Sequence, residues 1–187
     1  MDARIIIING SGGSGKSTFV KLCQEILEDN ISWENNWEIL ELSTVDWVKA
    51  VAQFAGWDGK KDEKNRRFLH QLKMALEEWD NSPNQKVFDQ INSVINNKML
   101  SKKNCLFFVN IREPKCIENF IKQNEIATGL PCSTMLVENA NVAPIISNPA
   151  DGEVHYYHYD TIISNSSDLE NLKKWAHDYL KYVQKII

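Results

Sequence analysis

The segment from Arg4 to Leu27 constrains the fold of this 187-residue chain more than any other. It begins with Arg4-Ile5-Ile6-Ile7-Ile8-Asn9, whose unbroken β-branched character is typical of a parallel strand buried on both faces. The stretch Gly10-Ser11-Gly12-Gly13-Ser14-Gly15-Lys16-Ser17-Thr18 follows directly and satisfies the pattern GxxxxGK[ST]. Apolar residues then recur at helical spacing, at Phe19, Leu22, Cys23, Ile26 and Leu27. Strand, glycine-rich turn and helix in this order predict a phosphate-binding loop.

The residue types in this loop suit phosphate chemistry. Small residues let successive backbone N–H groups turn inward around phosphate oxygens, and the N-terminus of the following helix adds positive potential. Lys16 is expected to reach the β- and γ-phosphates, and the Ser17 hydroxyl to ligate Mg²⁺. The predicted nucleotide-binding residues are Gly10, Ser11, Gly12, Gly13, Ser14, Gly15, Lys16, Ser17 and Thr18.

The rest of the chain alternates between strand and helix patterns. Strands are predicted at residues 37–42, 105–109, 134–137 and 158–163, and helical stripes at 45–55, 68–79, 87–95, 117–121 and 169–183. This alternation predicts an α/β fold, with a mostly parallel five-stranded sheet and helices on both faces. The length fits a single domain over residues 1–187. Within it, residues 44–100 form a helical insertion, and residues 139–154, with two prolines and one glycine, form a lid-like loop.

Composition argues against several classes of protein. The chain has 25 acidic residues against 21 Lys and Arg and carries no basic run, which disfavours nucleic acid as a partner. No apolar run approaches the roughly 20 residues that span a bilayer, so no membrane partner is expected. The cysteines lack CxxC spacing and are expected to be free thiols of a cytoplasmic protein; they are Cys23, Cys105, Cys116 and Cys132.

Size and motifs narrow the choice among proteins with a phosphate loop. A small GTPase shows an Asn-Lys-x-Asp base reader and an Asp-x-x-Gly switch, and neither pattern occurs in this chain. Motor, recombinase and helicase cores need a longer chain. Compact phosphotransferases with a helical segment after the second strand remain.

Three further stretches resemble one family of such enzymes. Ser43-Thr44-Val45-Asp46-Trp47-Val48-Lys49 is similar to the Ser-Thr-Gly-Asp-x-x-Arg stretch that opens the acceptor site of adenylate kinases, with lysine in place of arginine. Gly56-Trp57-Asp58-Gly59-Lys60-Lys61-Asp62, with Arg66 and Leu69, and the tail from Tyr159 to Asn165 add to the likeness. The chain therefore resembles the P-loop nucleoside monophosphate kinases, most of all the phage-type deoxynucleoside monophosphate kinases and their bacterial relatives.

The resemblance implies a three-layer P-loop kinase fold and transfer of the γ-phosphoryl group of ATP, with Mg²⁺, to a small phosphorylated acceptor, a (deoxy)nucleoside monophosphate. Lys16 and Arg112 would neutralise the transferring group, and Asn165 would begin the loop beside the nucleotide base. Ser17 would ligate Mg²⁺, with Asp46 or Glu113 as outer-sphere partners. The residues implied for acceptor binding are Asp46, Lys49, Lys60 and Arg66.

Two departures from the family pattern keep alternatives open. No Lys or Arg occurs between Lys122 and Lys173, where related kinases carry lid arginines, and Asn110 stands in the region of a usual aspartate. One alternative is a kinase for another phosphorylated metabolite such as phosphomevalonate, whose animal kinases resemble this group. Another is a nucleotide-binding regulatory protein without transferase activity. The acceptor and the oligomeric state stay open, with a homodimer as one option.

Overall fold

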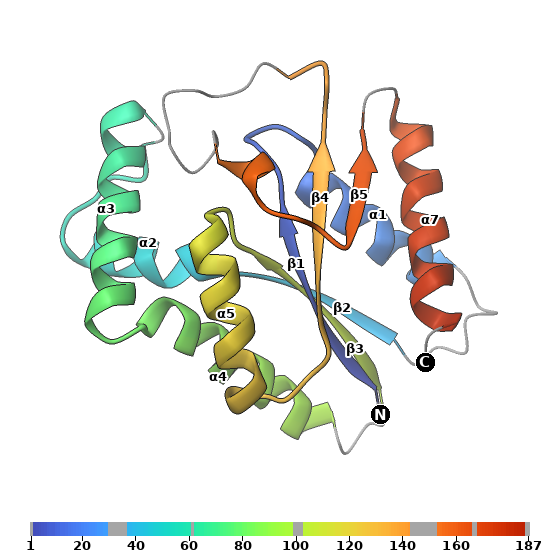
Figure 1. Cartoon of the computed structure of the whole chain (residues 1–187), viewed down its shortest axis with the longest axis horizontal. Helices are drawn as coiled ribbons and strands as arrows, with labels where there is room; N and C mark the ends of the chain where they lie inside the picture. Colours follow the sequence, from blue (N-terminus) through green and yellow to red (C-terminus); the bar gives the residue numbers. More distant parts are fainter. Residues whose placement is uncertain are drawn as a thin grey trace.

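A single parallel sheet forms the centre of the molecule (Figure 1). The structure is a computed structural model, and it describes residues 2–29, 37–60, 62–98, 103–142, 153–165 and 168–185. The strands are β1 (Ala3–Asn9), β2 (Trp37–Ser43), β3 (Asn104–Asn110), β4 (Cys132–Glu138) and β5 (Thr161–Ser164). They lie in the order β2-β3-β1-β4-β5, and every neighbouring pair is parallel. The predicted α/β fold is confirmed, with a sheet that is parallel throughout.

Helices cover both faces of the sheet. They are α1 (Lys16–Asp29), α2 (Thr44–Phe54), α3 (Glu63–Trp79), α4 (Ser82–Lys98), α5 (Pro114–Ala127) and α7 (Leu169–Lys185), with the short 3-10 helix η1 (Val154–Tyr156). Figure 1 shows α1 and α7 on one side of the sheet and α4 and α5 on the other. Among the described residues, no helix is both long and apolar enough to cross a bilayer.

The alternation of side chains along β1 explains the two layers of helices. Ile6 and Ile8 belong to the core cluster that contains residues of α1 and α7, whereas Ile5 and Ile7 belong to the cluster with α4 and α5. Both faces of this central strand are buried, and all four isoleucines are 2% exposed or less. A strand buried on both faces reads as a continuous apolar run, which is the pattern in the sequence.

Three helices, α2, α3 and α4, lie between β2 and β3 in the sequence. The side chain of Ser43 caps α2 by accepting a hydrogen bond from the N–H of Val45, and Asp62 caps α3 in the same way from Asn65. Helix α3 contacts α2 and α4 and lies on the opposite side of the molecule from α7 (Figure 1). The last part of the predicted segment 44–100 falls on residues 99 and 100, which are outside the described residues.

The apolar stripe predicted on α3 does not form a core face. Phe68 is 38% exposed and Trp79 is 85% exposed, whereas Lys73 is the buried residue of this helix. The reason is that α3 packs on other helices and turns part of its surface to a cleft rather than to the sheet.

The final strand starts later than the pattern 158–163 predicted. Asp160 lies before β5 and accepts hydrogen bonds from the backbone N–H and the hydroxyl of Thr134, both at 2.8 Å. This side-chain contact joins the chain to β4 just before the ladder of β5 begins at Thr161. Of the predicted lid-like loop 139–154, residues 143–152 are outside the described residues.

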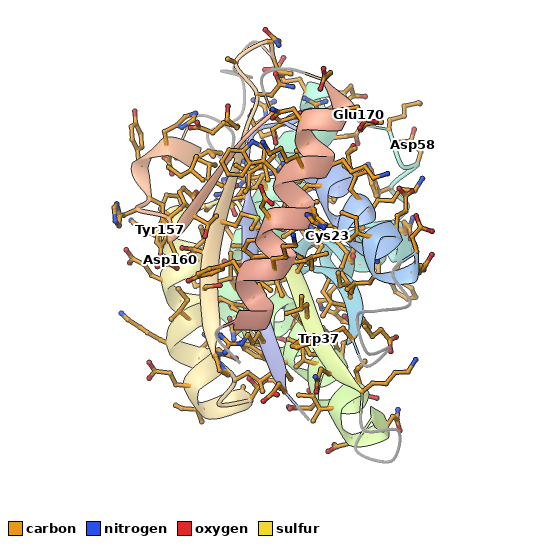
Figure 2. The ribbon with its side chains drawn as sticks, turned by 90° about the vertical axis from the view of Figure 1, so that its right-hand side faces the viewer. Cys23, Trp37, Asp58, Tyr157, Asp160 and Glu170 are labelled. Carbon is orange, nitrogen blue, oxygen red and sulfur yellow. The ribbon has the colours of Figure 1, made fainter. Side chains whose placement is uncertain are left out.

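The four cysteines are free thiols. Cys23, Cys105 and Cys116 are buried and Cys132 is half-buried. Burial raises the pKa of the Cys23 thiol strongly and that of Cys132 to about 12. Figure 2 looks onto α7 and shows Cys23 of α1 close to it, in the core cluster that the two helices share. Cys23 thus packs as a small apolar group, whereas the thiol of Cys116 donates to Oε2 of Glu77 at 3.1 Å.

Candidate functional site

The carboxyl ends of β1, β2 and β3 come together at one edge of the sheet. The register pairs Ile8 with Asn110, and Ser43 with the same Asn110, so the three strand ends stand side by side. The phosphate loop leaves the sheet at this edge, directly after Asn9. Open parallel sheets bind ligands outside the carboxyl ends of their strands, so this edge is where a site is expected.

A cleft of about 800 Å³ opens at this edge and extends from the phosphate loop to α3. Its lining includes Gly12, Gly13, Gly15, Lys16, Ser17, Thr18, Glu41, Thr44, Asp46, Lys49, Trp57, Lys60, Arg66, Leu69, His70, Lys73, Asn110, Arg112 and Glu113. Six of its side chains are Lys or Arg and three are Asp or Glu. The cleft is therefore positively charged, although the chain as a whole carries a formal charge of −4. A positive cleft suits an anionic ligand.

The geometry of the phosphate loop requires glycine at two positions. Gly10 has φ +147°, and a Cβ there would stand 2.3 Å from the carbonyl oxygen of Val137. Gly15 has φ +102°, and a Cβ there would stand 2.3 Å from Nδ2 of Asn165. Larger residues at either position would push the loop away from its neighbours.

The ammonium of Lys16 lies over this loop. It donates hydrogen bonds to the carbonyl oxygens of Gly10 and of Ser11, the second at 3.0 Å. The side chain is half-buried and lines the cleft, so it faces the space where a phosphate would lie.

A carboxylate that the sequence analysis did not single out lies beside Ser17. The Ser17 hydroxyl donates to Oε1 of Glu41 at 3.1 Å, and Nδ2 of Asn110 donates to the same oxygen at 2.8 Å. The acids expected near Mg²⁺ from the sequence were Asp46 and Glu113, and neither belongs to β2. The available signal was a charged residue two positions before the end of β2.

The two acids named as outer-sphere partners of Mg²⁺ have other neighbours. Asp46 lies 2.9 Å from the ammonium of Lys49, one helical turn along α2. Glu113 contacts Lys73 of α3, and Nδ1 of His70 lies 3.4 Å from its other oxygen. Glu41 is therefore the carboxylate in direct contact with Ser17.

Lys73, Glu77 and Glu113 form a buried charged cluster at the wall of the cleft, which Lys73 and Glu113 line. The side chains of Lys73, Glu77 and Glu113 are 3%, 7% and 14% exposed, and Lys73 and Glu77 lie 3.6 Å apart. Burial by itself lowers the pKa of Lys73, but the two carboxylates more than offset it and hold that pKa above its usual value. Burial by itself raises the pKa of Glu113, but the contacts of this carboxylate, chiefly with the neighbouring Lys73 ammonium, lower it by more than burial raises it. The pKa of Glu113 therefore lies below its usual value, and the carboxylate stays ionised. This cluster joins α3 to the start of α5.

The predicted acceptor-binding residues all line the cleft. Lys60 pairs with Asp58 at 2.7 Å, and this contact raises the pKa of the exposed Lys60. Arg66 is exposed and makes no ion pair with any residue in the described part of the chain. Arg66 is therefore available to an anionic ligand.

Arg112 and Asn165 approach the phosphate loop from two further segments. Arg112 follows β3 and lines the cleft. Asn165 follows β5, where its Nδ2 donates to the carbonyl oxygen of Ser14 at 2.9 Å. The structure thus brings together, around one loop, residues that the sequence separates by more than a hundred positions.

Three buried polar atoms on residues that line the cleft have no hydrogen-bond partner in the described part of the protein. They are Nε1 of Trp57, Oγ1 of Thr44 and Nδ1 of His70. Buried polar groups are almost always paired, so an unpaired donor beside a cleft is an indication of a ligand.

No protein-family model matches the chain, and no curated protein is significantly similar to it in sequence. Solved structures are similar in fold. A suspected kinase from Chloroflexus aurantiacus j-10-fl gives a TM-score of 0.52 at 10% identity, covering 97% of both chains. The thymidylate kinase from Ehrlichia chaffeensis gives 0.51 at 14% identity, covering 96% of this chain and 100% of that one.

An APS kinase from Mycobacterium tuberculosis, solved with AMPPNP and APS, gives a TM-score of 0.48 at 12% identity, covering 96% of this chain and 98% of that one. At such low identities the likeness concerns the fold. The all-parallel sheet with helices on both faces matches the fold of the two structures that score above 0.5. The chain has the three-layer P-loop kinase fold.

Proposed function

We propose that this protein is an ATP-dependent phosphotransferase that moves the γ-phosphoryl group to a small phosphorylated acceptor, a (deoxy)nucleoside monophosphate. The observation that carries the proposal is one basic cleft with a phosphate loop at one end and the Arg66 face of α3 at the other. Phosphoryl transfer needs two anionic reactants aligned end to end and their charge neutralised. A single cleft with cations at both ends meets both needs.

On the donor side, the phosphate loop from Gly10 to Thr18 holds the phosphates of ATP through its backbone N–H groups and the N-terminus of α1. Lys16 and Arg112 neutralise charge on the transferring group. Asn165 supports the phosphate loop by donating a hydrogen bond to the carbonyl oxygen of Ser14.

The residues beside Ser17 fit a magnesium ion. The Ser17 hydroxyl and the Glu41 carboxylate are oxygen groups 3.1 Å apart, the ligand type that Mg²⁺ prefers together with water and phosphate. When bound, the ion supplies positive charge to the β- and γ-phosphates. Asn110 keeps Glu41 in position by donating to its Oε1.

On the acceptor side, Arg66 binds the phosphate of the acceptor because its guanidinium is not engaged by the described residues. The rest of the acceptor lies against Trp57 and Leu69, where the unpaired indole N–H donates to an acceptor atom of the base. Residues 44–100 are therefore the acceptor-binding insertion.

ATP turnover with a panel of acceptors tests this proposal. The panel contains ribonucleoside and deoxyribonucleoside monophosphates, phosphomevalonate, and a sample without acceptor. We expect ADP formation that depends on a nucleoside monophosphate, with a product heavier by one phosphoryl group. If phosphomevalonate alone is phosphorylated, the protein is a kinase for a phosphorylated metabolite other than a nucleotide. Binding of ATP with no transfer to any acceptor would contradict the proposal and favour a nucleotide-binding regulatory protein.

Arg66→Ala is expected to raise the KM for the acceptor at least about tenfold, because a charge-assisted hydrogen bond contributes about 1.5–3 kcal/mol. Affinity for an ATP analogue should stay within twofold, since Arg66 belongs to the far end of the cleft. Lys60→Ala should have a smaller effect, because Lys60 already pairs with Asp58.

Arg67→Ala is the matched control for Arg66→Ala. Arg67 is the next residue of α3, is exposed, and is not among the cleft residues. Steady-state kinetics measure the KM for the acceptor, and calorimetry measures the affinity for the ATP analogue. Equal losses in both variants, or a parallel loss of ATP affinity, would argue against the acceptor site.

Glu41→Gln is expected to raise about tenfold the Mg²⁺ concentration that half-saturates ADP binding, because groups that hold a metal ligand typically affect affinity by 10- to 100-fold. Asp46→Asn serves as the contrast, since Asp46 pairs with Lys49. Calorimetric titrations of ADP at a series of Mg²⁺ concentrations measure both. A larger shift in the Asp46 variant would move the metal site to α2.

A further inference from the structure

Asn9 is buried where β1 ends, and its side chain joins three segments of the chain. Its Oδ1 accepts a hydrogen bond from the N–H of Gly10 at 2.7 Å. Its Nδ2 donates to the carbonyl oxygen of Arg112 at 2.8 Å and to the hydroxyl of Tyr159 at 2.6 Å. The Tyr159 hydroxyl in turn donates to the carbonyl oxygen of Val154 at 2.8 Å. We call these five residues the Asn9 network.

The hydrogen-bonding capacity of the two side chains is largely used. The amide of Asn9 employs its oxygen and both of its N–H groups, and Tyr159 both accepts and donates. Asn9 is 0% exposed and Tyr159 is 6% exposed, so water does not compete. Burial raises the pKa of Tyr159 to about 12, so its hydroxyl keeps the proton that it donates. Such a network holds its members in one arrangement.

The segments that the network joins carry two groups of the proposed transfer site. Gly10 begins the phosphate loop, and its carbonyl oxygen accepts a hydrogen bond from Lys16. Arg112 follows β3 and lines the cleft. Arg112 lies outside the ladders of the described strands, because β3 ends two residues earlier, at Asn110. The amide of Asn9 therefore fixes the backbone of Arg112 relative to the phosphate loop at a point that the sheet does not reach.

We propose that Asn9 and Tyr159 are positioning residues, which set the backbone of Arg112 against the first residue of the phosphate loop and tie both to η1 through Val154. The proposal rests on the phosphotransferase function given above. Neither side chain touches the reactants. Both act through Arg112, whose guanidinium has to meet the phosphoryl group as it moves from donor to acceptor. Small displacements of a charge-neutralising group cost large factors in rate.

Tyr159→Phe is the main test, because it keeps the ring and removes both hydrogen bonds of the hydroxyl. We expect kcat to fall about tenfold, with the KM values for ATP and for the acceptor within twofold of wild type. In an Arg112→Ala background the same substitution should change kcat less than twofold, since its effect passes through Arg112. Additive losses in the double variant, or a loss confined to KM, would overturn the proposal.

Tyr157→Phe is the matched control. The rings of Tyr157 and Tyr159 stand 5.1 Å apart, and Tyr157, labelled in Figure 2 beside Asp160, does not take part in the Asn9 network. Removal of its hydroxyl should leave kcat within twofold of wild type. An equal loss of kcat in this variant would show that aromatic packing, and not the Tyr159 hydroxyl, is responsible.

Amide hydrogen exchange tests the same link without any turnover. In the wild type, AMPPNP with Mg²⁺ should slow exchange at the phosphate loop and also at residues 153–159. In Tyr159→Phe the slowing at the loop should remain and that at 153–159 should be lost. If no acceptor is ever phosphorylated, the proposed function fails, and this measurement still decides the role of the network. Unchanged exchange at 153–159 in the wild type would overturn it.

Discussion

Lys16→Ala is expected to lower phosphoryl transfer by roughly 10²–10⁴-fold while the chain stays folded. The ammonium of Lys16 lies over the loop on the carbonyl oxygens of Gly10 and Ser11 and faces the cleft, so its removal leaves the core unchanged. Loss of one charged contact to a developing transition state costs about 3–5 kcal/mol, which corresponds to the stated range. Single-turnover transfer assays and circular dichroism provide the two readouts.

Lys21→Ala is the control for this prediction. Lys21 lies on the same helix, and its exposed side chain forms an ion pair with Glu25 at 3.6 Å. Its removal should leave transfer within twofold of wild type. A Lys16 variant with normal transfer and an unchanged spectrum would show that the loop does not bind the donor phosphates.

Lys73→Met is expected to lower the free energy of unfolding by about 3–5 kcal/mol, because it removes one partner from a buried ionic cluster. The substitution keeps most of the side-chain volume but leaves the carboxylates of Glu77 and Glu113 together, at 7% and 14% exposure, without their cation. Urea unfolding of variant and wild type measures the difference. Lys64→Met, at an exposed position of the same helix, should change stability by no more than about 0.5 kcal/mol.

The pH dependence of the free energy of unfolding distinguishes the loss of the Lys73 charge from a loss of packing. In the wild type the pKa of Glu113 lies below its usual 4.5, so the stability it contributes is present above pH 4.5 and is lost as pH falls through the lowered pKa. In Lys73→Met the Glu113 carboxylate has lost the ammonium that lowers its pKa, so it takes up a proton more readily in the folded state and acidification should stabilise the variant. The difference in free energy of unfolding between wild type and Lys73→Met should therefore become smaller toward pH 4. A gap that stays constant from pH 7 to pH 4 would indicate lost packing alone.

The parts of the fold that the sequence predicted are those fixed by local patterns. The isoleucine run of β1 and the glycines of the loop each need a particular backbone and burial, whatever the rest of the chain does. The parallel sheet could be predicted from the alternation of strand and helix patterns along the chain, because parallel strands need long connections that are usually helical. The apolar stripe on α3 predicted the helix but not what the helix faces, since a helix that lines a cleft has the same apolar spacing as one that covers a sheet.

The missed residues depend on neighbours that are distant in the sequence. Glu41 becomes informative only when β2 lies beside β3 and its carboxylate meets Ser17 and Asn110. Lys73 on a charged helix is ordinarily solvated, and its burial depends on Glu113, which lies 40 residues away. One signal was available, because Lys73 follows Leu69 by four residues and so shares its helix face.

The hydrogen bonds that Tyr159 and Asn165 make to the loop region have a consequence for how the chain is made. Their partners, Asn9 and Ser14, precede them by 150 and 151 residues. A ribosome therefore releases the glycine-rich turn long before the residues that hold it. Contacts of such separation form late, because the chain has to close a long loop first. Partly made chains should therefore lack the nucleotide affinity that we propose for the folded protein.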